Sequence, residues 1–473
     1  MKRKALIICL IFIFTLSFAS WAKEISKSTS EDQVDVEVTI YNSNLGLVKD
    51  VRKVALPRGI GELRFMDVAS GIKPVTVKIR SLNYPDKFSV LEQNYEYDLM
   101  NADKLLDKYV GRKIKIVDWN KYKGRKEVVD ALLLSNNNGQ IYKINNEIYL
   151  GHPGYKVLPK IPENLIAKPT LTWLYNNQIK KRHKLETSYL TDGINWKADY
   201  VVVLNKDDTS CDLSGWVTID NKSGATYKDA RLKLVAGKVH KVEEKYYTDE
   251  MVLYEKLALA GKPQFKEEGF FEYHLYDLQR RTTLKNNQTK QISLLDAEGV
   301  GVDKELRVYG IRSYYTRRYR PENPKQPVEV YINLMNSEDN NLGMPLPEGI
   351  MRLYKKDKEE SLQFIGEDRI EHTPKNEKIS LKIGEAFDVV AERIQTDYKH
   401  LGGDVYESEW EIILRNHKED DIIVNIIEPL CGDWQIIDNN YPYKKIDAFT
   451  IKFNVNIPKD GEVKVKYRAR IDI

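Results

Sequence analysis

Several features are scarce in this sequence, and each scarcity excludes a class of protein. The 473 residues include only 3 cysteines, which excludes a disulfide-stabilised scaffold and a zinc site built from four thiolates. Neither sign of charge dominates, because 74 Lys and Arg stand against 70 Asp and Glu, for a net charge of +4. A dedicated nucleic-acid-binding protein carries a strong basic excess, so we expect no nucleic-acid partner. Beyond the N-terminal segment no apolar run reaches the ~18 residues of a membrane helix, so we expect no transmembrane span in the mature chain.

The first residues, 1–22, have the three parts of a secretory signal peptide. Met1–Lys4 is basic, Ala5–Phe18 is almost wholly apolar, and Ser20–Ala22 places small residues at both key positions of a cleavage site. The apolar run is shorter than the ~20 residues that span a bilayer, which favours cleavage after Ala22 over an uncleaved anchor. We therefore expect an exported protein of the periplasm or cell surface. In such a compartment Cys211 and Cys431 could pair, but both lie in strand-like segments where a lone cysteine packs as a small apolar residue, and we expect them unpaired.

The main periodicity of the chain is two residues. Apolar and polar side chains alternate in 34–40, 75–79, 449–457 and 463–473. Successive side chains of a strand point to opposite faces, so each segment has one apolar and one polar face. The pattern predicts an all-β protein of several antiparallel β-sandwich domains with little helix. We expect only two short helices, one capped by Asn101 and one by Thr248.

Turn and proline signals divide the chain into three parts after the signal peptide. Residues 30–98 are predicted to form an N-terminal β unit, and residues 99–160 a small barrel-like β unit with one short helix. Residues 165–473 are predicted to form a large β-sandwich region with a polar insertion near 238–264. The strands predicted within the small unit are Lys113–Val117, Glu127–Ser135, Gln140–Ile144 and Glu147–Leu150.

Several segments of the large region resemble one known family in the order in which they occur. They are Thr187–Tyr200, Gly215–Gly224, Asp229–Gly237, Lys290–Leu295, Leu346–Gly349, Gly366–Pro374, Gly384–Asp388 and Gly432–Trp434. Together they resemble the domain of unknown function 4139 of mucoidy-inhibitor-A-like exported bacterial proteins, over roughly residues 187–471. The helical coiled-coil insertion of those relatives is absent, and the small β unit takes its place. The resemblance implies an exported bacterial β protein and implies no reaction.

Motifs for catalysis, cofactors and metals are missing. The sequence contains no His-Glu-x-x-His, Gly-x-Ser-x-Gly, Gly-x-Gly-x-x-Gly or P-loop motif, so we expect no cofactor and no metal. The one acid/base candidate is Glu367 or Asp368 with His372 as partner, which would suit hydrolysis if they lined a cleft with Trp196. The alternative is a strand end followed by a turn, with Arg369 and a carboxylate in a surface or half-buried ion pair and with Trp196 in the core.

Two basic segments are candidate binding surfaces. Arg312, Tyr315, Arg317 and Arg318 could bind an anionic glycan or a protein, or they could form a strand with a solvated basic edge. The second set is Lys464, Lys466, Arg468 and Arg470, whose spacing of two puts all four on one face of the last strand. These four could protect an edge strand, or they could dock an anionic polymer.

Two functions remain after these exclusions. The favoured one is an exported, non-enzymatic bacterial cell-envelope protein that binds a partner or has a structural role, with an envelope protein or an anionic polymer as candidate partner. The alternative is a hydrolase of envelope glycan or peptide with its site near Glu367–His372.

Overall fold

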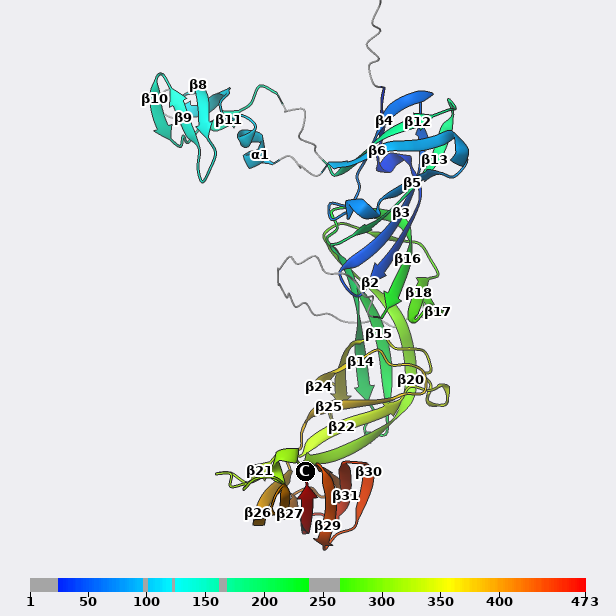
Figure 1. The fold of residues 1–473 in the computed structure, drawn as a ribbon, viewed down its shortest axis with the longest axis vertical. Coiled ribbons are helices and arrows are strands. Elements are labelled where there is room, and N and C mark those ends of the chain that lie inside the picture. Colours follow the sequence, from blue (N-terminus) through cyan, green and yellow to red (C-terminus); the bar gives the residue numbers. More distant parts are fainter. Residues whose placement is uncertain (1–23, 97–100, 121–123, 161–167, 238–263) are drawn as a thin grey trace, which may run out of the picture. The chain divides into compact units, whose positions relative to one another are not determined.

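The computed structural model describes residues 24–96, 101–120, 124–160, 168–237 and 264–473. Strands make up 65% of the structure and helices 5%, so the prediction of an all-β protein is confirmed. Among the described residues, no helix is long and apolar enough to cross a membrane. The chain folds into two units, and strands predominate in both (Figure 1). The predicted helix at Thr248 and most of the predicted insertion lie outside the described residues.

Of the residues that the structure describes, the first unit comprises 24–36, 48–96, 101–120, 124–160 and 168–191. Its four-stranded sheet has the order β1-β4-β12-β6, and β13 pairs separately with β5. The strands are β1 (Ile25–Ser28), β3 (Leu45–Ala55, partly in this unit), β4 (Gly59–Met66), β5 (Lys78–Ser81), β6 (Phe88–Glu96), β12 (Thr170–Asn177) and β13 (Arg182–Thr191). The 3-10 helices are η1 (Ser30–Asp32), η2 (Pro74–Thr76) and η3 (Pro85–Lys87).

Two sequence expectations change in this unit. The large region was expected to begin near residue 165, but β12 lies between β4 and β6, so residues 168–191 belong to the first unit. The predicted strand at 75–79 is wrong in its first half, because Pro74 begins the 3-10 helix η2 and leaves Val75 exposed. Only the residues from Lys78 onward pair as β5.

The small β unit contains one helix and one five-stranded antiparallel sheet. Helix α1 (Ala102–Asp107) is capped as predicted, since the Asn101 side chain accepts a hydrogen bond from the Lys104 N–H. The sheet has the order β10-β9-β8-β7-β11, so β10 and β11 are its edges and it is not a closed barrel. Its strands are β7 (Lys113–Asn120), β8 (Arg125–Ser135), β9 (Ile141–Ile144), β10 (Glu147–Leu150) and β11 (Tyr155–Val157).

The second unit comprises the described residues 37–47, 192–237 and 264–473. A long sheet runs in the order β24-β23-β14-β15-β20-β28-β31-β30, with β22 pairing β20 and β25. A further sheet has the order β21-β26-β27-β32-β29, and β16 pairs with β2, β18 and β19. The strands are β2 (Gln33–Tyr41, partly in this unit), β14 (Ile194–Leu204), β15 (Ser210–Asn221), β16 (Tyr227–Ala236), β17 (Phe265–Phe270), β18 (Tyr273–Leu278), β19 (Thr282–Leu284), β20 (Gln288–Tyr309), β21 (Lys325–Gln326), β22 (Glu329–Met335), β23 (Gly349–Lys356), β24 (Leu362–Ile370), β25 (Lys378–Glu385), β26 (Val389–Gly402), β27 (Val405–Asn416), β28 (Ile422–Pro429), β29 (Asp433–Asn439), β30 (Tyr443–Asp447), β31 (Thr450–Ile457) and β32 (Glu462–Asp472). The 3-10 helices are η4 (Arg312–Tyr314) and η5 (Glu338–Asn340).

The C-terminal part of the second unit is a β-sandwich. Apolar side chains of β28 and β31 in one sheet and of β26, β27 and β32 in the other belong to a single core around Trp410 and Phe453. The predicted alternation is confirmed from Ile451 to Ile457 and from Val465 to Ile471, where the apolar residues are buried and their neighbours are more exposed. At the ends of the two predicted segments, Phe449 and Ile473 lie outside the strands and are exposed. Cys211 and Cys431 are unpaired, as expected.

Candidate functional site

The acid/base candidates on β24 are held in structural contacts. The Glu367 carboxylate lies 3.1 Å from Nε of Arg352 on the paired strand β23. The Asp368 carboxylate accepts hydrogen bonds from the backbone N–H groups of Arg369 and Lys382, both at 2.8 Å. These contacts connect β24 to its neighbours, and the ion pair of Glu367 is made with Arg352 of β23 rather than with Arg369.

The proposed catalytic partners are not brought to one cleft. Nδ1 of His372 accepts a hydrogen bond from the backbone N–H of Glu348 at 3.1 Å. Trp196 is buried, and its indole N–H donates to the carbonyl oxygen of Val235, so it belongs to the core and does not line a cleft. Among the described residues, no group of three or more His, Cys, Asp and Glu side chains could hold a metal ion.

The basic aromatic segment is not a strand, so that expectation is wrong. It forms η4 and an irregular stretch, and Tyr315 is completely buried. The Tyr315 hydroxyl donates to Glu428 Oε2 at 2.7 Å and lies 2.8 Å from the Tyr467 hydroxyl. Burial raises the pKa of Tyr315 well above its usual value. Tyr315 is therefore a core residue, while the side chains that remain exposed are Arg312, Arg317 and Arg318.

The C-terminal cations do not protect a sheet edge. Strand β32 lies between β27 and β29, so the edge-strand interpretation is wrong. The register of β27 and β32 sets Glu411 opposite Lys466, Glu409 opposite Arg468 and Glu407 opposite Arg470. Two strands with the same spacing and opposite charges thus form one ladder across the sheet.

Ion pairs largely neutralise this ladder. Lys466 Nζ lies 2.6 Å from Glu411, and Lys464 Nζ lies 3.5 Å from Glu462. A hydrogen bond to Glu411 raises the pKa of Lys466. Arg468 pairs with Asp397 and Glu409, and Arg470 pairs with Glu407, at 2.5–2.9 Å. Arg470 also lines a hollow of about 390 Å³, which it shares with Val405, Asp433, Trp434, Gln435 and Asp472.

A hollow of about 510 Å³, which was not predicted from the sequence, lies at one end of the four-stranded sheet of the first unit. Its position follows from the register, because Asn177 at the end of β12 lies opposite Gly59 of β4 and Phe88 of β6. Arg58 precedes Gly59 and Lys87 precedes Phe88, so the two cations lie on opposite sides of β12. Their backbones are about 10 Å apart, twice the spacing of neighbouring strands.

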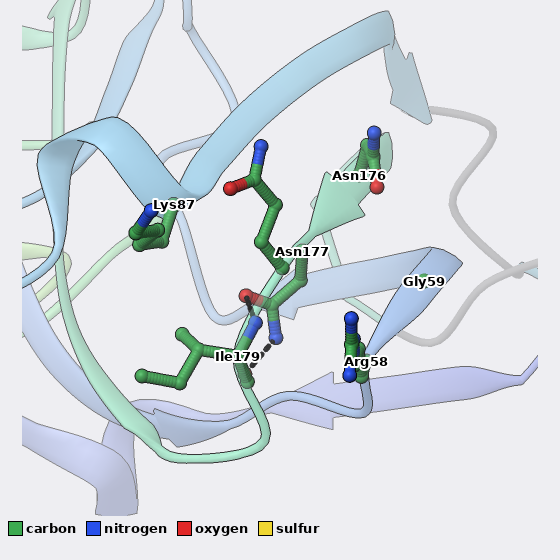
Figure 2. A pocket seen from close by; sticks show the side chains of 7 residues that line it. Arg58, Gly59, Lys87, Asn176, Asn177 and Ile179 are labelled. Atoms are coloured by element: carbon green, nitrogen blue, oxygen red, sulfur yellow. Dashed lines mark hydrogen bonds between the residues drawn. The ribbon is translucent and has the colours of Figure 1, made fainter.

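Asn177 holds the base of this hollow together. Its buried side-chain amide donates to the carbonyl oxygens of Leu56, Pro57 and Ile179 at 2.6–3.3 Å, and its oxygen accepts from the Ile179 N–H. Figure 2 shows the bonds between Asn177 and Ile179, with Arg58, Lys87 and Asn176 around them. These contacts fix the turn before β4 to the end of β12.

The Lys87 side is fixed too. The backbone N–H of Gln178 donates to the Lys87 carbonyl oxygen at 2.9 Å. On the other side, Gly59 adopts a φ of +104°, which favours glycine and lets the chain turn sharply from Arg58 into β4. Both cations are thus carried by backbone that hydrogen bonds and turn geometry hold in place.

The polar side chains around this hollow have free hydrogen-bonding capacity. Within the described ranges, the side chains of Arg58, Lys87, Asn176 and Gln178 make no ion pair or hydrogen bond. No carboxylate lines the hollow. Two cations and two carboxamides form a donor-rich set that suits a carboxylate or phosphate flanked by hydroxyl groups. We call these four residues the anion pocket.

Sequence reasoning identified only part of the anion pocket. The sequence Pro57–Gly59 is typical of a turn, but nothing local connects Arg58 with Lys87 or with residues 176–178. A scan against protein-family models finds no match for the chain, and a search of curated proteins finds no relative.

Proposed function

We propose that the chain is an exported bacterial cell-envelope protein that binds an anionic glycan without catalysing a reaction. The observation that carries this proposal is the anion pocket, in which unpaired cations and carboxamides surround a hollow without a carboxylate. Its volume falls in the range of ~300–1,000 Å³ typical of small-ligand sites. The signal-peptide pattern and the resemblance to exported proteins with the domain of unknown function 4139 support an envelope location.

The hydrolase alternative has less support. A general acid or base needs a free carboxyl or imidazole group facing a substrate. Glu367 and Asp368 instead contact Arg352 and backbone N–H groups, and His372 accepts from the Glu348 N–H. Neither of the two hollows described above is lined by these residues. We therefore assign them a structural role.

Calorimetric titration with a uronic-acid oligosaccharide tests the proposal. The acidic oligomer should bind, while its neutral methyl ester should bind weakly or not at all. The double variant Arg58→Gln/Lys87→Gln should lose about tenfold or more in affinity per charge removed, because each charge-assisted hydrogen bond contributes roughly 1.5–3 kcal/mol.

A matched control removes two exposed lysines of the same unit outside the pocket. Lys53→Gln/Lys78→Gln makes the same change in net charge and should bind as the parent does. Equal affinity of the parent and the pocket variant would contradict the proposed site. Release of new reducing ends from an envelope glycan would instead favour the hydrolase.

The envelope location has its own measurement. Intact mass of the protein from the exported fraction should correspond to a chain beginning after Ala22. A full-length mass, or recovery in the cytoplasm alone, would contradict export.

A further inference from the structure

The sheet of the small β unit is apolar on both faces. Its inner face packs Ile116, Leu133 and Tyr142 against Leu106 and Tyr109 from helix α1 and the turn after it. Since side chains alternate along a strand, the opposite face should be polar if it is exposed only to water. Instead, most of its side chains are apolar.

The register identifies the side chains of the outer face. Val117 lies opposite Val128 on one side and Tyr155 on the other, which gives an apolar row across three strands. Lys143 lies opposite Leu132 and Ile148 in a second row. The outer positions of the five strands are Lys113, Lys115, Val117, Trp119, Lys126, Val128, Asp130, Leu132, Ile141, Lys143, Ile148, Leu150, Tyr155 and Val157.

Large apolar side chains of this outer face are strongly exposed. Leu150 and Tyr155 are each 84% exposed, Ile148 is 68% exposed and Trp119 is 59% exposed. Leu150 and Tyr155 belong to the two opposite edge strands, so apolar side chains extend across the whole width of the sheet. Contiguous exposed apolar surface of this kind marks an interaction site.

The same face carries uncompensated positive charge. Four lysines and one aspartate give it a net charge of +3, and the lysines are Lys113, Lys115, Lys126 and Lys143. In the part of the chain that the structure describes, none of these lysines pairs with a carboxylate. This distinguishes the outer face from the ladder on β27 and β32, where each cation is paired with a carboxylate.

We propose that the outer face of the β7–β11 sheet docks on an anionic phospholipid surface. Exposed Leu and Ile side chains can enter the boundary of the acyl chains, while lysines around them pair with lipid phosphates. Trp119 and Tyr155 have an apolar body and a polar tip, and such side chains favour the membrane–water interface. A soluble acidic glycan would match the lysines but would leave the aliphatic side chains without a partner. The proposal goes beyond the anion pocket and involves none of its residues.

Vesicle flotation with the purified full protein tests this inference. The protein should bind vesicles that contain phosphatidylglycerol, bind pure phosphatidylcholine vesicles weakly, and lose binding as salt screens the charges. Residues 5–18 form an apolar run that could bind vesicles by itself, so parent and variants must share the same N-terminus, verified by intact mass. Differences between variants then belong to the outer face.

Two variants separate the charged and the apolar contributions. Lys113→Gln/Lys115→Gln/Lys143→Gln should weaken binding to the anionic vesicles about a hundredfold, at roughly fivefold for each lysine. Leu150→Ser/Tyr155→Ser changes no charge and should weaken binding about tenfold or more. The matched control Lys27→Gln/Lys53→Gln/Lys78→Gln removes the same net charge from exposed lysines elsewhere and should bind as the parent does. Far-UV circular dichroism of each variant should match that of the parent, which excludes unfolding as the cause.

Three outcomes would overturn the inference. The first is the absence of binding to phosphatidylglycerol vesicles at low salt, including the case in which the protein still binds a soluble polyanion or a protein partner. The second is an equal loss of binding in the lysine variant and its matched control. The third is unchanged binding of the Leu150/Tyr155 variant, which would leave only non-specific attraction between charges.

Discussion

The strongest test of the C-terminal sandwich is the removal of one charge from its buried ion pair. Nη2 of Arg393 lies 2.6 Å from Oε1 of Glu428, and neither side chain has any exposed area. Tyr315 donates to the other carboxylate oxygen, and Nε of Arg393 donates to Gln326 at 2.9 Å. Burial alone would lower the pKa of Arg393, but the facing Glu428 carboxylate more than offsets this, and the pKa lies above its usual value. Each charge therefore depends on the other to remain in the core.

Glu428→Gln keeps the shape of the side chain and removes its charge. The Arg393 guanidinium would then stay buried without a counter-charge, and breaking a buried pair in this way costs about 3–5 kcal/mol. Arg393→Met should be similarly destabilising, because it leaves the carboxylate unpaired. The double variant Arg393→Met/Glu428→Gln should lose less stability than the two single variants lose together, since it leaves no unpaired charge in the core.

Hydrogen-exchange mass spectrometry of peptides from β27 and β28 measures this loss in the sandwich itself, without assuming that the whole chain unfolds in one step. The matched control is Glu186→Gln, which breaks an ion pair of similar length, 2.7 Å to Arg80, in which the arginine side chain is 69% exposed. Exposed pairs contribute at most about 1 kcal/mol, so this variant should change little in its own peptides. If Glu428→Gln costs no more than the control, the argument from burial is wrong.

Two further predictions concern acid stability and thiols. Burial alone would raise the pKa of Asp208, but hydrogen bonds from Lys304 and Lys355 lower it below its usual value. The contribution of Asp208 to stability is therefore complete above its unfolded-state pKa and is lost as pH falls through its folded-state pKa. Asp208→Asn should lower the free energy of unfolding at neutral pH and make that free energy fall less steeply in acid. Urea unfolding at several pH values measures both effects. Burial raises the pKa of Cys211 to about 12 and also raises that of the more exposed Cys431, so native alkylation should label Cys431 first. A thiol titration of the unfolded, unreduced protein should find both thiols free, and finding neither would contradict the structure.

The strands were predictable wherever local alternation was strong. Strands β31 and β32 follow the predicted alternation from Ile451 to Ile457 and from Val465 to Ile471. The same rule failed at Val75, because Pro74 fixes its own φ and begins a 3-10 helix. Local pattern also could not assign β12 to the first unit, because its partners β4 and β6 precede it by many residues and a linker signal stands between them. Sequence reveals that a segment is a strand more readily than which strand lies beside it.

The charge ladder shows the same limit at a candidate site. The spacing of two correctly put Lys464, Lys466, Arg468 and Arg470 on one face of β32. The segment Glu407-Ser-Glu-Trp-Glu411 has the same spacing with the opposite charge, and that was the available signal for an adjacent strand. A segment with like charges at every second residue should therefore be compared with segments that carry the opposite charge at the same spacing. Only if none is found should its charges be interpreted as exposed to solvent or as a binding surface. Here that comparison replaces a docking surface with a set of internal ion pairs.

The two surfaces proposed for binding differ in how far sequence could have located them. The anion pocket joins Arg58, Lys87 and residues 176–178 through the register of three strands, so it needed the structure. The outer face of the small sheet was partly visible beforehand, because Val117 and Trp119 stand at positions that alternation with the buried Ile114 and Ile116 assigns to solvent. Apolar residues at solvent positions contribute nothing to the core, and in water they favour aggregation. Such residues among unpaired lysines therefore indicate a surface that is covered in the functional state by a partner both apolar and negatively charged, and an anionic lipid bilayer has both properties.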